Sequence, residues 1–238
     1  MTHALYEIPR FRLAGDRGLL VEFGDGIDLA VNRKVRAAAL ALEDPLPAGV
    51  IEIVPTYRSL LIVYDPMRTG PSDLEHMLLR LVEKIDESRI PEPKTVEIPV
   101  CYGGEFGPDI AFVAEAHGLS LAAVVRIHSE PAYPVYMIGF TPGFPFLGGL
   151  PEALHTPRLE TPRTHVPEGS VGIANAQTGV YPVASPGGWR LIGRTPLRLF
   201  APEREDPFRY AAGDRIRFVP ISLEKYHRIA AEEGREDP

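Results

Sequence analysis

Residues 161–200 have the sequence TPRTHVPEGSVGIANAQTGVYPVASPGGWRLIGRTPLRLF, and their pattern predicts the fold of the second half of the chain. Short β-branched or aliphatic runs recur in it between prolines and glycines, and helical periodicity is absent. The same texture extends from Pro131 to Pro220. Strands are predicted at Val135–Ile138, Val171–Ala174, Val180–Val183, Leu197–Phe200 and Arg215–Val219. Many short strands joined by tight turns predict a closed or nearly closed β structure.

The first part of the chain alternates strand and helix signals instead. Short strands are predicted at Phe11–Ala14 and Leu19–Phe23, and a hairpin at Val50–Val54 and Leu60–Tyr64. Between them, apolar residues recur at helical spacing, at Ile27, Val31, Val35, Ala38 and Leu42. A second helix is predicted from a capping-box signature at Ser72–Glu75. Its apolar face would consist of Leu74, Leu78, Leu81, Val82 and Ile85.

A further strand is predicted at Val96–Val100, after two prolines. The elements up to this point follow the order β-α-β-β-α-β, which predicts a ferredoxin-like α/β sandwich with two helices on one face of an antiparallel sheet. The prolines in Ile90–Lys94 mark the boundary. We therefore expect an α+β protein with an N-terminal domain at 1–93 and a β-barrel domain with a helical connector at 94–238. The strand at Val96–Val100 could belong to either domain.

Composition and charge narrow the class of protein. The chain has 238 residues, 45% hydrophobic and 24% charged, which is typical of a globular protein long enough for two domains. A formal net charge of -7 argues against nucleic acid as a partner. Cys101 is the single cysteine, and no basic region followed by an apolar region opens the chain, so we expect a cytoplasmic protein. No apolar run approaches the roughly 18–20 residues that cross a membrane.

A helix-turn-helix pattern lies within residues 108–127, with Gly118 at the turn and Ser120 placed to cap the second helix. The second helix would offer Arg126 as its single cation, whereas base recognition needs several polar side chains. We therefore expect two packed helices that join the two domains.

No complete catalytic signature is present in the sequence. It contains no phosphate loop of the Gly-Lys-Ser or Gly-Lys-Thr type, no Gly-x-Gly-x-x-Gly, no Gly-x-Ser-x-Gly and no His-Glu-x-x-His. His128, His155 and His165 lack close metal-ligand spacing, so we expect no metal site and a structural or surface role for each. His128 is also a candidate acid or base, because an unperturbed imidazole titrates near neutral pH.

Glycines and prolines cluster within residues 139–193. They permit or fix backbone geometry that other residues resist, so they indicate rigid loops around a cleft, or the tight turns of a small barrel. Four arginines lie beside these turns: Arg158, Arg163, Arg190 and Arg194. Because a guanidinium can hold a carboxylate or phosphate, we expect Arg163 and Arg194 to bind an anionic ligand. Ion pairs within the protein are the alternative.

Polar side chains between these arginines could orient a small amide or acid. The candidate catalytic residues are His128, Arg163, Gln177, Tyr181, Ser185 and Arg194. The candidate substrate-binding residues are Arg158, Ser170, Thr178, Gly187, Gly188 and Trp189. Hydrogen bonding at turns and strand ends is the alternative for Ser170 and Thr178, and filling of the barrel core is the alternative for Trp189.

Several long motifs carry a family resemblance. They are GDRGLLVEFGD at Gly15–Asp25, IPVCYGGEFGPD at Ile98–Asp109, GFTPGFPFLGGL at Gly139–Leu150, TPR at Thr156–Arg158, and the Thr161–Phe200 stretch quoted above. Together they resemble the signature of the family formed by the B subunit of 5-oxoprolinase, also called allophanate hydrolase subunit 1 or KipI. The resemblance spans nearly the whole chain.

The resemblance implies an N-terminal α+β domain followed by a cyclophilin-like β-barrel. It also implies two partners: a C subunit, related to allophanate hydrolase subunit 2, and an A subunit of the LamB/YcsF type. Together the subunits would open the lactam 5-oxoproline to glutamate, with the B and C subunits activating it by phosphorylation and the A subunit completing ring opening. ATP with Mg²⁺ is expected at the level of the complex, with no identifiable site on this chain, which we expect to be inactive alone.

In this setting Arg163 and Arg194 would hold the anionic end of the ligand. Two positions depart from the family pattern: Asn175 replaces a turn glycine, which its tolerance of left-handed geometry allows, and Glu168 adds a carboxylate near Arg163. An inhibitor of a sensor histidine kinase, as the KipI name implies, is one alternative function. Another is a carboxyltransferase-type subunit related to urea carboxylase, which would need a biotin-carrying partner.

Overall fold

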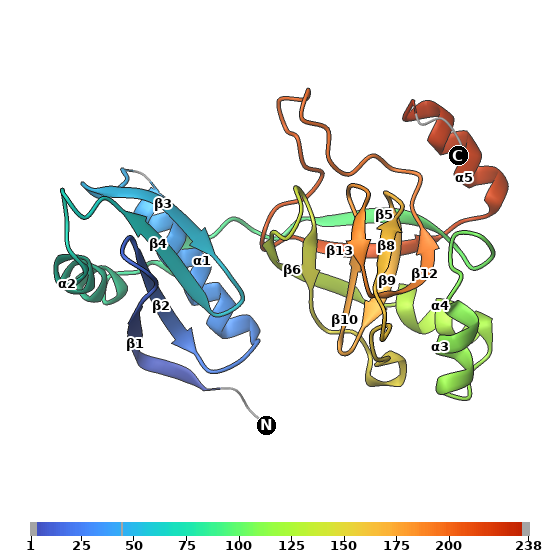
Figure 1. The fold of residues 1–238 in the computed structure, drawn as a ribbon, viewed down its shortest axis with the longest axis horizontal. Helices are drawn as coiled ribbons and strands as arrows, with labels where there is room; N and C mark the ends of the chain where they lie inside the picture. Colours follow the sequence, from blue (N-terminus) through green and yellow to red (C-terminus); the bar gives the residue numbers. More distant parts are fainter. Residues whose placement is uncertain (1–3, 44, 235–238) are drawn as a thin grey trace. The chain divides into compact units, whose positions relative to one another are not determined.

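The computed structural model describes residues 4–43 and 45–234, which form two compact units, Met1–Glu92 and Pro93–Pro238 (Figure 1). The first unit contains one sheet with strand order β1-β2-β4-β3, antiparallel throughout. Its elements are β1 (Leu5–Leu13), β2 (Gly18–Gly24), α1 (Leu29–Glu43), β3 (Val50–Pro55), β4 (Ser59–Tyr64), α2 (Pro71–Val82) and the 3-10 turn η1 (Glu87–Arg89).

Alternate residues of the central strands form the core of this unit. Leu19, Val21 and Phe23 of β2 are almost fully buried, and they belong to one apolar cluster with side chains of both helices. Because side chains alternate across a strand, both helices cover the same face of the sheet. The helix residues in the cluster are Val31, Val35, Ala38, Ala39, Leu42, Leu74 and Leu78.

The chain order of the first unit differs from the expected β-α-β-β-α-β. The described order is β-β-α-β-β-α, and β1 takes the position beside β2. A tight turn explains this pairing, because the Ala14 N–H donates to the Gly18 carbonyl at 2.8 Å and Gly15 has a φ of 72°. The strand predicted at Val96–Val100 lies in β5 (Thr95–Tyr102) and pairs within the second unit.

The second helix also begins earlier than its capping-box signature indicates. Gly70 is the N-cap and Pro71 the first helical residue, so Ser72 does not cap the helix. Proline suits the first helical position because its φ is preset and no partner is needed there for an N–H. The helix ends at Val82, and Ile85 packs on the core from beyond it.

The second unit is built around a seven-stranded sheet with the order β10-β9-β12-β5-β13-β6-β7 (Figure 1). All its pairings are antiparallel except β5 with β13. The sheet is nearly closed, since a Cβ on Gly179 of β10 would lie 3.4 Å from the Pro145 carbonyl oxygen of β7. The strands are β6 (Ala132–Ile138), β7 (Pro145–Leu147), β9 (Ser170–Ala174), β10 (Gln177–Val180), β12 (Arg190–Arg194) and β13 (Arg215–Pro220). A two-stranded sheet pairs β11 (Ser185–Gly187) with β8 (Arg163–Val166).

This architecture confirms the expected two-unit α+β fold with a nearly closed sheet, and two predicted strands need correction. The prediction at Val180–Val183 is wrong beyond Val180, where β10 ends before Pro182. Leu197–Phe200 is not a strand; Phe200 makes an isolated bridge to Phe208. The physical reason is proline, which removes a ladder donor at Pro182 and Pro196.

Residues 108–127 contribute to two packed helices, α3 (Ile110–Ala116) and α4 (Leu121–Ser129), as expected. They do not join the two units, because both lie within the second unit, between β5 and β6. Ser120 caps α4 as predicted, accepting from the Ala123 N–H at 3.2 Å. Val124 and His128 are fully buried against the barrel, so this face of α4 is not available to a DNA groove. A 3-10 turn, η2 (Glu152–Leu154), follows β7 and packs near α4.

No single helix in residues 4–43 and 45–234 is both long and apolar enough to cross a membrane, although α3 and α4, bent by 96°, pass that length and composition test as a pair.

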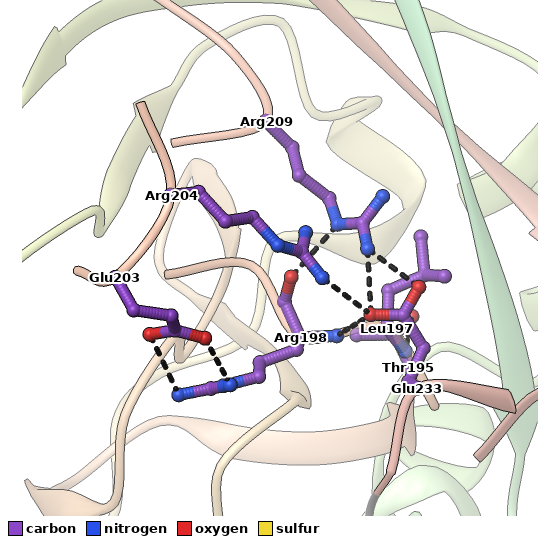
Figure 2. Close-up of polar contacts among 7 residues, drawn as sticks. All are labelled: Thr195, Leu197, Arg198, Glu203, Arg204, Arg209 and Glu233. Atoms are coloured by element: carbon purple, nitrogen blue, oxygen red, sulfur yellow. Dashed lines mark hydrogen bonds and ion pairs between the residues drawn. The ribbon is translucent and has the colours of Figure 1, made fainter. Parts of the chain in front are cut away.

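The last helix, α5 (Leu223–Glu232), is fixed to the barrel at both ends. Tyr226 stacks on Phe106 with ring centroids 4.3 Å apart. Glu233, directly after the helix, pairs with Arg209 and Arg204 and accepts from the Arg198 backbone N–H (Figure 2). Figure 2 shows these arginines converging on one carboxylate, which ties the long segment before β13 to α5.

Candidate functional site

A cleft of about 400 Å³ opens beside the two-stranded sheet of the second unit. It is framed by the loop before β7, the segment before β8, and the turn between β11 and β12. Its lining residues are Phe140, Phe144, Phe146, Arg158, Pro162, Tyr181, Pro186, Gly187, Gly188 and Trp189. The cleft is mainly aromatic, with one guanidinium, so it suits a small ring compound that carries a negative charge.

The cleft brings together five residues that the sequence singled out: Arg158, Tyr181, Gly187, Gly188 and Trp189. Trp189 and Tyr181 are 6% and 1% exposed, and each stands edge-on to Phe144, with centroids 5.6 and 5.3 Å apart. These buried rings give the cleft a fixed wall. Trp189 therefore combines the two roles considered for it, since it fills an apolar cluster and lines the cleft.

The Tyr181 ring leaves no room for a side chain at position 187, which is a glycine. A Cβ on Gly187 would lie 2.5 Å from the Tyr181 hydroxyl, so any larger residue would displace the ring. Burial raises the pKa of Tyr181 to about 12, although a backbone hydrogen bond with Trp189 and the charges of Arg158 and Arg163 oppose that effect. The phenol is therefore protonated at neutral pH and keeps its hydrogen-bonding proton.

Arg158 is the cation of the cleft. Its side chain is exposed, and its guanidinium carbon lies 6.0 Å from the Trp189 ring centroid. Within the part of the chain that the structure describes, no carboxylate lies within ion-pair distance of it. Its charge is thus available to a ligand.

Arg163 is engaged by the protein itself. Its Nη2 donates to both carboxylate oxygens of Asp109 at 2.9 Å, and its Nη1 donates to the Trp189 carbonyl at 3.2 Å. Asp109 also accepts from the Leu191 N–H at 2.7 Å. Asp109 is thus the carboxylate that pairs with Arg163. This arrangement fixes β8 to β12 and holds the backbone of Trp189 in the cleft wall.

Arg194 lies apart from the cleft-lining residues. Its Nε donates to the Glu168 carbonyl at 2.8 Å, and its guanidinium carbon lies 5.9 Å from the Phe106 ring centroid. In the β9–β12 ladder it pairs with Ser170, which is 2% exposed. The structure therefore does not bring Arg163 and Arg194 together around one ligand site.

His128 and Thr178 meet in the barrel interior, both fully buried. Thr178 Oγ1 donates to the Gly172 carbonyl at 3.0 Å, so the His128 Nε2, 2.7 Å away, donates to Thr178. Nδ1 then accepts from the Tyr102 hydroxyl at 2.8 Å. Burial lowers the pKa of His128 to about 3. This neutral imidazole satisfies two hydroxyls and lies outside the cleft lining, which fits the structural role considered first for it.

Gln177 and Ser185 also lie outside the cleft lining. Gln177 is at the start of β10, opposite Ala174, and Ser185 is at the start of β11, opposite Val166. The Ser185 hydroxyl oxygen is buried and has no hydrogen-bond partner among the described residues.

The candidate residues chosen from the sequence leave out half of the cleft lining. Phe140, Phe144, Phe146, Pro162 and Pro186 line it. The aromatic residues were visible in the motif GFTPGFPF, where three phenylalanines recur among turn residues. Asp109 was equally visible at the end of IPVCYGGEFGPD. The prediction for Asn175 is confirmed, because its φ is 52° in the β9–β10 turn.

A metal-binding group of three or more His, Cys, Asp or Glu side chains does not occur in residues 4–43 and 45–234.

Comparison with known proteins gives a consistent set of relatives. The family model for the carboxyltransferase domain, subdomain C and D, matches residues 9–210. The B subunit of 5-oxoprolinase from Bacillus subtilis (strain 168) is 44% identical over 232 residues, which cover 92% of this chain and 95% of that protein. The B subunit from Escherichia coli O157:H7 is also 44% identical, over 89% of this chain and 95% of that protein.

Among solved structures, TTHA0988 is 43% identical with a TM-score of 0.77. The match covers 87% of this chain but 40% of the TTHA0988 chain, so this chain spans less than half of that protein.

Proposed function

The chain belongs to the family of 5-oxoprolinase B subunits, and we propose that it acts as the B subunit of an ATP-dependent 5-oxoprolinase, which opens 5-oxo-L-proline to L-glutamate. The observation that carries this proposal is the 44% identity to the Bacillus subtilis B subunit over 92% of this chain and 95% of that protein. Similarity of this extent covers both units, and it therefore includes the cleft.

We propose two partners, a C subunit related to allophanate hydrolase subunit 2 and a LamB/YcsF-type A subunit. The relatives are named as one subunit of 5-oxoprolinase, which supports a complex. TTHA0988 adds support, because a homologous segment there occupies 40% of a longer chain. ATP and Mg²⁺ act at the level of the complex, and this chain is inactive alone. A cytoplasmic location fits a buried free Cys101.

The finer fold assignments also belong to this proposal. The second unit would be a cyclophilin-like barrel. In the first unit, β2, α1, β3, β4 and α2 follow the ferredoxin-like order, and β1 occupies the sheet position of that fold's last strand.

The aromatic cleft is the proposed contact site for 5-oxoproline. This substrate is a small lactam ring with one carboxylate, and the cleft offers ring faces and one available guanidinium. Arg158 would bind the carboxylate, because a charge-assisted hydrogen bond is stronger than a neutral one. Phe144 and Trp189 would hold the ring and exclude water. Arg163 would act indirectly, by fixing the Trp189 backbone through its 3.2 Å contact.

Reconstitution tests the proposed activity directly. ATP-dependent release of glutamate from 5-oxoproline is measured with this chain alone, with the C subunit added, and with both the C and A subunits added. We expect release in the complete mixture only. No release in a mixture of folded subunits would refute the proposed function.

The role of Arg158 is tested within the active mixture. Arg158→Ala should raise the KM for 5-oxoproline roughly tenfold or more, since an interaction with a charged group contributes about 1.5–3 kcal/mol. Arg217→Ala is the matched control, because Arg217 is exposed on β13 and pairs loosely with Glu97 at 3.9 Å. Equal KM values for the two variants would exclude Arg158 from substrate binding.

A further inference from the structure

Phe140 occupies a strained backbone position at the cleft. Its φ is 65°, and the Thr141 N–H donates to the Gly139 carbonyl at 2.8 Å across it. A hydrogen bond that spans one residue of positive φ defines the rarer and more strained form of the γ-turn. Among the described residues, Phe140 and Asn175 are the non-glycine residues with positive φ. Asparagine tolerates this region, whereas a bulky ring does not.

The rest of the loop is a regular, tightly bonded turn. The Phe144 N–H donates to the Thr141 carbonyl at 3.0 Å, with Pro142 and Gly143 between them. Gly143 has a φ of 82°, so these residues form a type II turn with the preferred proline and glycine. The Gly139 N–H also donates to the Phe144 carbonyl at 3.1 Å. Phe140 is therefore held at a fixed place and is not on a loose flap.

A contact outside the loop holds it from the other side. The Tyr210 hydroxyl donates to the Gly143 carbonyl at 2.8 Å, and both groups are buried. A Cβ on Gly143 would lie 3.1 Å from the Phe208 ring. The surrounding structure thus imposes the turn, which is the condition under which backbone strain persists.

The strained residue gains little from folding in return. The Phe140 side chain is 67% exposed, and its ring contact is edge-on to Phe144 at 5.5 Å. Glycine would remove the strain, and this chain places glycine at positive φ in many other turns. The ring itself is therefore the feature that needs an explanation. It lines the cleft, so its apolar surface faces the volume that a ligand would fill.

We propose that Phe140 is a specificity-determining residue of the cleft, whose ring packs against the ring of the bound lactam and limits the ring size that is accepted. This inference rests on the proposed function, because the occupant is the substrate of that reaction. The fixed turn holds the aromatic surface in position before binding, so no ordering of the loop is required when the ligand enters.

Three measurements on Phe140→Gly test the proposal. In the complete mixture of subunits, the KM for 5-oxoproline should rise roughly tenfold. The preference for 5-oxoproline over 6-oxopiperidine-2-carboxylate, which has one more ring carbon, should fall several-fold. The melting temperature of the variant chain should stay the same or rise by about 2 °C, because the strain is relieved.

Direct binding gives a readout that does not depend on turnover. Trp189 is the single tryptophan in the sequence and lines the cleft, so 5-oxoproline should change the fluorescence of the full wild-type chain. The Phe140→Gly chain should need a roughly tenfold higher concentration for the same change. Asn175→Gly is the matched control, since it relieves positive φ at a residue outside the cleft lining and should leave KM and binding unchanged.

The outcomes separate this proposal from the one it rests on. A wild-type mixture that releases no glutamate refutes the proposed function. An active wild type with an unchanged KM and ring-size preference in Phe140→Gly overturns the assignment of Phe140. A lower melting temperature with unchanged 5-oxoproline binding would show that the ring serves folding instead. Loss of complex assembly with unchanged 5-oxoproline binding would show that the ring contacts a partner protein. That result would also overturn the assignment of Phe140.

Discussion

The Asp109–Arg163 pair provides a test of whether Arg163 supports the cleft or binds its ligand. Asp109 accepts from the Arg163 guanidinium at 2.9 Å and from the Leu191 N–H at 2.7 Å. The two side chains differ in exposure, with 11% for Asp109 and 29% for Arg163. Removing the aspartate therefore leaves the buried Leu191 N–H without its acceptor. Removing the arginine takes away its bonds to Asp109 and to the Trp189 carbonyl but keeps the bond between Asp109 and Leu191.

The expected magnitudes follow from this asymmetry. Asp109→Ala loses three hydrogen bonds to a charged acceptor, two from Arg163 and one from the Leu191 N–H, and leaves that N–H without its partner. This should cost about 3 kcal/mol of unfolding free energy. Arg163→Ala leaves the Leu191 contact in place, and water can reach part of the site, so about 1–2 kcal/mol is expected. The double variant should cost less than the sum of the two, because the pair interaction is lost once.

Urea unfolding followed by Trp189 fluorescence measures these changes in the unit that contains the pair. Trp189 is in that unit and is the single tryptophan of the chain. The reasoning would be refuted by an Arg163→Ala chain of wild-type stability whose KM for 5-oxoproline rises tenfold or more. That result would restore Arg163 as a direct ligand contact.

Two further predictions concern buried and half-buried charges elsewhere. Burial lowers the pKa of His128 from 6.5 to about 3, so the unfolded chain binds the additional proton between these values. The free energy of unfolding should therefore fall by about 1.4 kcal/mol per pH unit as pH drops below 6.5. The urea midpoint measured against pH would show this fall. His128→Gln should flatten that curve, whereas His165→Gln, at an exposed site, should not. Glu233→Gln should cost about 1–2 kcal/mol in the same assay, because Glu233 pairs with two arginines (Figure 2), and an equal loss in Glu232→Gln would contradict this.

Local signals in the sequence were enough for most of the fold. The β2 strand, the α1 helix and the β3–β4 hairpin follow from periodicity and turns that are visible within a few residues. The sheet position of β1 and the unit to which β5 belongs depend on pairing between distant strands. No local pattern specifies such pairing, and the order of the first unit was therefore predicted incorrectly.

The candidate site likewise combines features set by local sequence with features set by contacts between distant residues. Clustered glycines and prolines indicated either rigid loops around a cleft or the tight turns of a small barrel, since turn geometry is a local property of a residue such as Gly143, and Pro162, Pro186, Gly187 and Gly188 of this cluster line the cleft. Which side chains face the cleft depends on how segments distant in the sequence pack together. Tyr181 and Trp189 line it, whereas Ser185, close to both in sequence, is not among the lining residues and its hydroxyl is buried.

The arginines give the clearest physical reason for this limit. Every arginine carries the same charge, so its role depends on whether the fold supplies a carboxylate nearby. Asp109 is 54 residues from Arg163, and the strand that brings them together forms only in the folded barrel. Arg158 keeps an available charge because no described acidic residue reaches it. An arginine that is available to a ligand is thus identified by the absence of a nearby carboxylate. That absence becomes visible only in the folded structure.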